Sequence, residues 1–164
     1  MVHSGNAEDA NVGAPGFSAM AKPAAAACNL SCRYCYYLHR PGMPPSRRMS
    51  RDVLEAYIRD TIAAQRSAPE LVFAWQGGEP TLAGTGFFEE AVALQKRYRP
   101  AGMVIANALQ TNGTLLDEDW AAFLREQGFL VGVSIDGPAR FHDPLRRDLK
   151  GRPSHAPAMV GTPP

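Results

Sequence analysis

The stretch LVFAWQGGEPTLAGTGFFEEAVALQKRY, residues 71–98, changes its hydrophobic period partway along its length. Residues 71–75 form a short apolar run that lies between Pro69 and a pair of glycines, which predicts a buried strand. After Thr85 the apolar residues recur at helical spacing, which predicts an amphipathic helix. A strand followed by a glycine-rich exit and a helix is one βα unit, so this stretch indicates an α/β fold.

The same alternation continues on both sides of this unit. Strands are predicted at 17–27, 103–109 and 129–135, and helices at 50–62 and 117–127. The first of these strands contains Pro23 and a run of alanines, which are poor strand formers. Strands that alternate with helices about every 30 residues predict a parallel sheet, and such sheets bind ligands at the carboxyl ends of their strands.

The strand exits share a polar, glycine-containing character. They read QGGEP, QTNG and SIDGP, each directly after a predicted strand. A single exit of this kind is explained by the needs of a βα turn. Three such exits that open onto the same rim, beside a cysteine cluster, favour a binding site.

Composition and charge narrow the class of protein. The chain has 164 residues, of which 45% are hydrophobic, so one globular domain is expected. Its formal net charge is +1, so neither nucleic acid nor a membrane surface is favoured as a partner. Residues 1–16 are small and polar and predict a disordered lead-in without the apolar core of a signal peptide. With no apolar run of roughly 18 residues, we expect a cytoplasmic protein.

All three cysteines of the chain fall in one loop, AACNLSCRYCYYLHRPG, residues 26–42. An odd, clustered set in a reducing compartment favours metal or redox chemistry over a disulfide framework. Cys28, Cys32 and Cys35 could form a zinc site with His39. Alternatively, the three thiolates could bind three irons of a 4Fe-4S cluster and leave the fourth iron open to a substrate or cofactor.

The loop CNLSCRYCYY resembles the cluster loop of the radical S-adenosylmethionine superfamily. WQGGEPTL, LQTNGTLL and LVGVSIDGP resemble further motifs of that superfamily in the same order. More specifically, AWQGGEPTL, ALQTNG and VSIDGPARFHD, with Arg146 shortly after, resemble the anaerobic sulfatase-maturating enzymes. The resemblance covers residues 17–153, which would be the N-terminal part of the radical SAM core.

The resemblance implies a fold and an activity. The fold would be part of a (β/α)6 barrel with parallel strands and about four βα units. A 4Fe-4S cluster and S-adenosylmethionine would generate a 5′-deoxyadenosyl radical that oxidises a sulfatase cysteine or serine to Cα-formylglycine. The implied partners are a sulfatase or other peptide substrate and a flavodoxin- or ferredoxin-type reductant. Another peptide-modifying member of the superfamily, a small zinc-stabilised binding module and an inactive fragment remain alternatives.

The resemblance also implies residue roles. The cluster ligands would be Cys28, Cys32 and Cys35, and the cofactor contacts Tyr34, Gly78, Glu79, Ser134 and Arg146. In this assignment Tyr34 packs near the adenine, Gly78 allows a close approach of the backbone, and Arg146 pairs with the cofactor carboxylate. The family's general base lies in a part that this chain lacks, so no catalytic residue is predicted.

The sequence departs from the family towards its end. Members continue through two more βα units and a C-terminal domain with auxiliary clusters, whereas no cysteine follows Cys35 here. Residues 154–164 show no strand or helix period, so we expect an irregular tail. A truncated or frame-shifted product that diverges near 151–155 is therefore expected, with an exposed strand edge.

Overall fold

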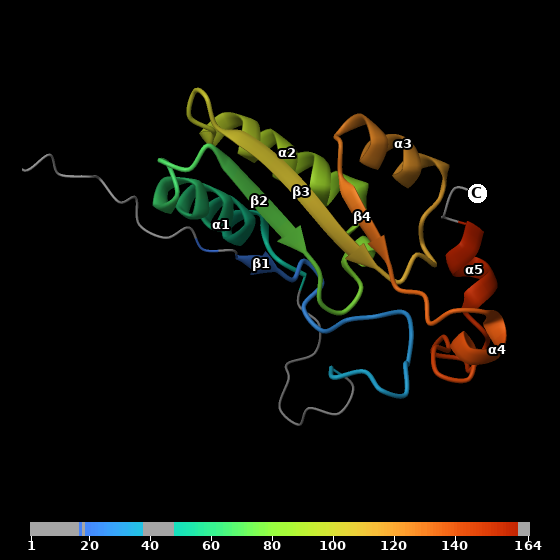
Figure 1. Cartoon of the computed structure of the whole chain (residues 1–164). Helices are drawn as coiled ribbons and strands as arrows, with labels where there is room; N and C mark the ends of the chain where they lie inside the picture. Colours follow the sequence, from blue (N-terminus) through green and yellow to red (C-terminus); the bar gives the residue numbers. More distant parts are fainter. Residues whose placement is uncertain (1–16, 18, 38–47, 161–164) are drawn as a thin grey trace, which may run out of the picture.

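The computed structural model describes residues 17, 19–37 and 48–160 (Figure 1). The strands are β1 (Met20–Ala21), β2 (Glu70–Trp75), β3 (Val104–Thr111) and β4 (Leu130–Val133). The helices are α1 (Arg51–Ala64), the 3-10 helix η1 (Pro80–Ala83), α2 (Thr85–Tyr98), α3 (Glu118–Glu126), α4 (Ala139–His142) and α5 (His155–Val160). The predicted lead-in over residues 1–16 lies outside the described residues.

The four strands form one parallel sheet in the order β1-β2-β3-β4. Helices α1 and α2 lie on one face of this sheet, and α3 follows beside α2 (Figure 1). The sheet is open rather than closed. The predicted α/β fold, with about four βα units on a parallel sheet, is confirmed.

Alternation along β2 places the core between the sheet and the helices. Phe73 and Trp75 are fully buried, while Val72 between them is exposed on the other face of the sheet. Phe88 of α2 meets Trp75 edge to face, with ring centroids 5.6 Å apart. Ile58 of α1 belongs to the same buried cluster. This core fixes the direction in which β2 leaves the sheet, towards its glycine-rich exit.

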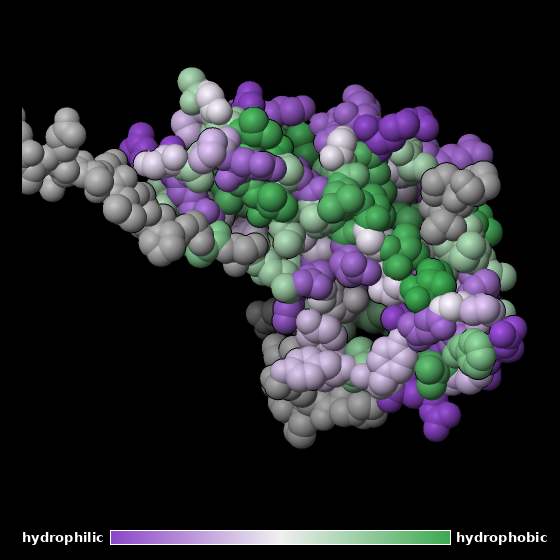
Figure 2. All heavy atoms as spheres, in the orientation of Figure 1, coloured by the Kyte–Doolittle hydropathy of each residue, from purple (hydrophilic) through white to green (hydrophobic). Residues whose placement is uncertain are grey.

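The open edge of the sheet is the far side of β4. Leu130 at the start of this strand is 73% exposed, and apolar residues reach the surface over β4 in Figure 2. The expected exposed strand edge is therefore present among the described strands. None of the helices in the described ranges has the length and apolarity that a membrane span requires.

Two local predictions were wrong. The first strand was predicted over 17–27 but spans only Met20–Ala21, because the chain turns at Pro23, where the Ala25 amide donates to the Lys22 carbonyl at 3.0 Å. Residues 155–160, predicted to be irregular, form α5. A helix of six residues is too short to show a hydrophobic period, and α5 is instead fixed by burial of Ala158.

Candidate functional site

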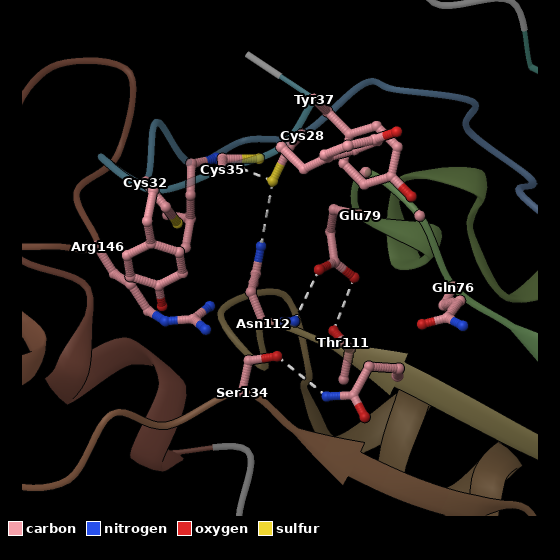
Figure 3. Close-up of a pocket in the computed structure, with 16 residues that line it drawn as sticks. Cys28, Cys32, Cys35, Tyr37, Gln76, Glu79, Thr111, Asn112, Ser134 and Arg146 are labelled. Carbon is pink, nitrogen blue, oxygen red and sulfur yellow. Dashed lines mark hydrogen bonds between the residues drawn. The ribbon is translucent and has the colours of Figure 1, made fainter. Parts of the chain in front are cut away.

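The strand exits and the cysteine loop enclose a cavity of about 350 Å³. The surface is hollowed there, below the end of β4 (Figure 2). All eight residues predicted for the site line this cavity (Figure 3): Cys28, Tyr34, Cys32, Cys35, Gly78, Glu79, Ser134 and Arg146. The strand exits and the family resemblance together therefore predicted which segments meet, and the roles of the individual residues stay predictions.

The cysteine loop is held by the segment that follows α4. The Ser31 amide donates to the Arg147 carbonyl at 2.7 Å, and the Arg33 amide donates to the Leu145 carbonyl at 2.9 Å. Leu30, which is buried, forms a bridge with Asp148. These contacts satisfy backbone groups between the first and last cysteine and hold the loop against this segment.

The three cysteines are unpaired thiols on one side of the cavity. Burial raises the pKa of the Cys28 thiol, and a hydrogen bond from the Leu30 amide at 3.3 Å opposes this. Burial also raises the pKa of Cys32, against which the charge of Arg146 acts. Soft thiol donors in this number fit an iron-sulfur cluster, in which each thiolate binds a different iron.

A mononuclear metal site was the alternative for this loop. His39, its predicted fourth zinc ligand, lies outside the described residues. In the part of the chain that the structure describes, no three His, Cys, Asp or Glu side chains converge as ligands of a single metal ion.

Glu79 links the exits of β2 and β3. Its carboxylate is almost fully buried, and Oε1 accepts hydrogen bonds from the Thr81 amide at 3.0 Å and from the hydroxyls of Thr81 and Thr111 at 2.6 and 2.7 Å. Oε2 accepts from the Asn112 amide at 2.7 Å. The cofactor contact predicted for Glu79 stays a prediction; what the structure shows is that its carboxylate holds two strand exits together (Figure 3).

Replacing Glu79 with glutamine tests this link. Glutamine keeps one carbonyl oxygen, but its amide group would face either the Asn112 amide or three donors, so at least one buried donor loses its acceptor. We expect the free energy of unfolding in urea to fall by about 2 kcal/mol. Glu89→Gln, at an exposed position of α2, is the matched control and should change it by less than about 0.5 kcal/mol. Equal effects of the two substitutions would contradict the bridging role.

Gly78 allows the exit of β2 to contact the cysteine loop. Its φ is +50°, and a Cβ there would lie 2.2 Å from the Ala27 carbonyl oxygen. The next amide, that of Glu79, donates to the same oxygen at 2.7 Å. The structure therefore brings Gly78 against the backbone directly before Cys28, and its predicted approach to the amino end of the cofactor stays a prediction.

Asp136 organises the other side of the cavity, and the sequence analysis did not select it. Its Oδ2 accepts from the Tyr34 hydroxyl at 2.6 Å and from Arg146 Nε at 3.1 Å. Burial acts to raise the pKa of Asp136, but these two donors outweigh it and the pKa is lowered. Burial and the bond to Asp136 raise the pKa of Tyr34 to about 12. The polar exit SIDGP was the available signal, since it contains this aspartate.

Ser134 is held by Gln110 across the end of the sheet. Gln110 Nε2 donates to the Ser134 hydroxyl at 3.0 Å. Gly132 makes room for this side chain, because a Cβ there would lie 2.4 Å from Gln110 Oε1. A second amide side chain, Asn112, donates to Cys28 Sγ at 3.7 Å (Figure 3). Neither amide was predicted, although both belong to the polar exit QTNG.

Known proteins share this arrangement of loops. The family model of the radical SAM superfamily matches residues 24–159, which extends past the point where divergence was expected. A serine-type anaerobic sulfatase-maturating enzyme of Klebsiella aerogenes is 47% identical over 88% of this chain and 36% of its own length. A cysteine-type enzyme of the same name from Clostridium perfringens is 45% identical over 84% of this chain and 37% of its own length.

A solved structure of a related protein is also similar to this chain. The structure described as native anSMEcpe with bound AdoMet and Cp18Cys peptide has a TM-score of 0.81 and 41% sequence identity. The similarity covers 90% of this chain and 39% of that chain. The present chain thus spans little more than a third of the length of these relatives.

Proposed function

This chain belongs to the radical SAM superfamily, and we propose that it is the cofactor-binding part of an anaerobic sulfatase-maturating enzyme. The observation that carries the proposal is the meeting of three unpaired thiols and three polar strand exits in one cavity. A cluster bound by three thiolates keeps one iron open, and the polar exits provide contacts for the group that binds there.

The proposed ligands of a 4Fe-4S cluster are Cys28, Cys32 and Cys35. When bound, the cluster and S-adenosylmethionine supply a 5′-deoxyadenosyl radical that removes a hydrogen atom from the substrate. The chain's own residues would bind and orient the cofactor, and the buried core behind β2 and β3 would keep their exits fixed while it binds.

Within the part of the chain that the structure describes, two of the proposed cofactor contacts have donors without a partner. Ser134 accepts from Gln110, so its own hydroxyl proton can be donated into the cavity. Arg146 uses Nε on Asp136, and a guanidinium has four further N–H groups with which Arg146 could pair with a carboxylate. Tyr34, Gly78 and Glu79 complete the proposed set, with Tyr34 beside the adenine and Glu79 near the amino group.

The proposed substrate is a cysteine or serine of a sulfatase, presented as a peptide and oxidised to Cα-formylglycine. Serine-type and cysteine-type relatives are similar to this chain to nearly the same degree, so both side chains stand as targets. The proposal includes a flavodoxin- or ferredoxin-type protein as the electron donor.

The test is anaerobic reconstitution of the purified chain with iron and sulfide, followed by electron paramagnetic resonance after reduction. We expect a 4Fe-4S signal that changes when S-adenosylmethionine is added, because the cofactor would bind the open iron. Adenosine at the same concentration, which lacks the amino and carboxylate groups of the cofactor, is the control and should leave the signal unchanged. A cluster signal that is indifferent to S-adenosylmethionine, or stoichiometric zinc in place of iron, would overturn the proposal.

A further inference from the structure

A buried polar pair lies beside the cavity and has no part in the proposed function. His142 is the last residue of α4, and Ser154 directly precedes α5. Their side chains are 0% and 2% exposed. His142 Nε2 lies 3.0 Å from Ser154 Oγ. Buried polar side chains are costly unless paired, so this pair calls for a structural or functional reason.

The hydrogen bonds around the pair determine which nitrogen of His142 carries the proton. The Ser154 hydroxyl has one proton, and it donates this proton to the Arg146 carbonyl at 2.8 Å. In the contact between Ser154 and His142 the ring nitrogen Nε2 must therefore be the donor. On the other side of the ring, Nδ1 accepts from the Asp136 amide at 3.3 Å. Together these contacts require the neutral Nε2–H tautomer.

The electrostatic surroundings agree with a neutral ring. Burial lowers the pKa of His142 most, and the charges of Arg146 and His155 lower it further. The carboxylates of Asp136 and Asp143 act to raise the same pKa. The net direction is downward. A second ring proton would also leave the Asp136 amide facing another N–H group, without an acceptor.

One contact of the pair ends on Arg146, which lines the cavity, and the other ends on Asp136, which binds the cavity residues Tyr34 and Arg146. His142 fixes the backbone of Asp136, and Ser154 fixes the backbone of Arg146. The side chains of Asp136 and Arg146 form an ion pair with 3.1 Å between Oδ2 and Nε, and Tyr34 donates to the same carboxylate oxygen. The pair thus anchors both partners of an ion pair that lies against the cavity.

The same anchor extends to the cysteine loop. The carbonyls of Leu145 and Arg147, on either side of Arg146, accept the amides of Arg33 and Ser31. A shift of Arg146 would therefore also move the backbone that holds the loop between the first and last cysteine.

We infer that His142 and Ser154 are positioning residues, which fix the ion pair of Asp136 and Arg146 and, through it, the orientation of Arg146 and Tyr34 towards the bound cofactor. This inference rests on the proposed function only for the identity of the ligand. The hydrogen bonds of the pair involve only residues of this chain and can be tested without the cofactor.

The first test is nitrogen-15 NMR of the metal-free chain labelled at histidine. We expect His142 to show a protonated Nε2 and an unprotonated Nδ1 at neutral pH, and His142→Gln identifies its resonances among the four histidines. A protonated Nδ1 in the unmodified chain would overturn the inference. This result does not depend on any cofactor, so it stands even if the chain fails to bind S-adenosylmethionine.

The second test separates positioning from folding. His142→Gln can still donate to Ser154 but cannot accept the Asp136 amide, and Ser154→Ala removes both contacts of the serine hydroxyl while its backbone amide can still donate to Asp143. In each variant we expect exchange of the Arg146 Nε proton with water to quicken by up to about tenfold, the size of effect that loss of one hydrogen bond has on an equilibrium. His155→Ala removes the neighbouring ring, whose centroid is 5.3 Å from that of His142, and should leave this exchange unchanged.

The reconstituted chain gives the matching readout for the cofactor. In His142→Gln we expect the Kd for S-adenosylmethionine to rise about tenfold while the iron content stays that of the unmodified chain. His142→Asn, whose amide oxygen can take the place of Nδ1, should restore most of the affinity. The variants could instead lose stability while the exchange of the Arg146 Nε proton and the affinity for S-adenosylmethionine stay unchanged. That result would show that the pair is purely structural and would overturn the inference. Loss of S-adenosylmethionine binding in the unmodified chain would instead count against the proposed function.

Discussion

Replacing Cys32 with alanine is expected to abolish the iron-sulfur cluster. The whole sequence contains three cysteines, so no other thiol can take the vacated position. Mutation of a residue that only hydrogen-bonds to a metal ligand lowers metal affinity by roughly 10–100-fold. Loss of a ligand itself should lower metal affinity by more than this. After anaerobic reconstitution, iron and acid-labile sulfide per chain should fall at least about tenfold, with loss of the reduced-cluster signal.

The matched control for this experiment is Ser31→Ala, an exposed neighbour in the same loop. It removes a small polar group without touching a thiol, and its amide can still donate to the Arg147 carbonyl. Full loading in Ser31→Ala together with loss in Cys28→Ala, Cys32→Ala and Cys35→Ala assigns the ligands. Undiminished loading in any of the three cysteine variants would remove that cysteine from the proposed set.

The elements that were predicted correctly are those that short windows of the sequence encode. Strand and helix periods are visible in short windows, so β2, α2 and β3 were predicted from runs such as LVFAW and MVIANAL. Because parallel strands end on one rim, the order of these elements was enough to bring Cys28 and Ser134 to the same cavity.

The failures involve contacts between distant segments. Tyr34 and Asp136 are 102 positions apart and hydrogen-bond directly, and no local pattern encodes that pairing. Glu79 likewise has its partners in two different exits. Such side chains look like ordinary polar loop residues in the sequence, and their function depends on which loop lies opposite. The sequence therefore predicted the rim of the site but not the network that fixes it.

Gly78→Ala is expected to prevent the exit of β2 from contacting the cysteine loop, and it should be the most damaging glycine substitution in this chain. A left-handed backbone costs a residue with a Cβ about 1–2 kcal/mol. At Gly78 the added Cβ would also lie 2.2 Å from the Ala27 carbonyl oxygen, which is backbone and cannot rotate away. We expect the free energy of unfolding to fall by about 3 kcal/mol or more and cluster loading to fall with it, because Ala27 directly precedes Cys28.

Substitutions at two other glycines separate the cost of the left-handed backbone from the cost of the contact with Ala27. Gly128 has a φ of +66° and no atom within 4 Å of an added Cβ, so Gly128→Ala isolates the backbone cost; it should destabilise by about 1–2 kcal/mol and leave cluster loading intact. Gly86 has neither feature and lies in α2, so Gly86→Ala should be neutral or stabilise by up to about 1 kcal/mol. If Gly78→Ala and Gly128→Ala cost the same and both load iron fully, then the contact with Ala27 does not hold the cysteine loop. If only Gly78→Ala loses iron, the glycine-rich exit acts on the cluster through the backbone that it holds in place.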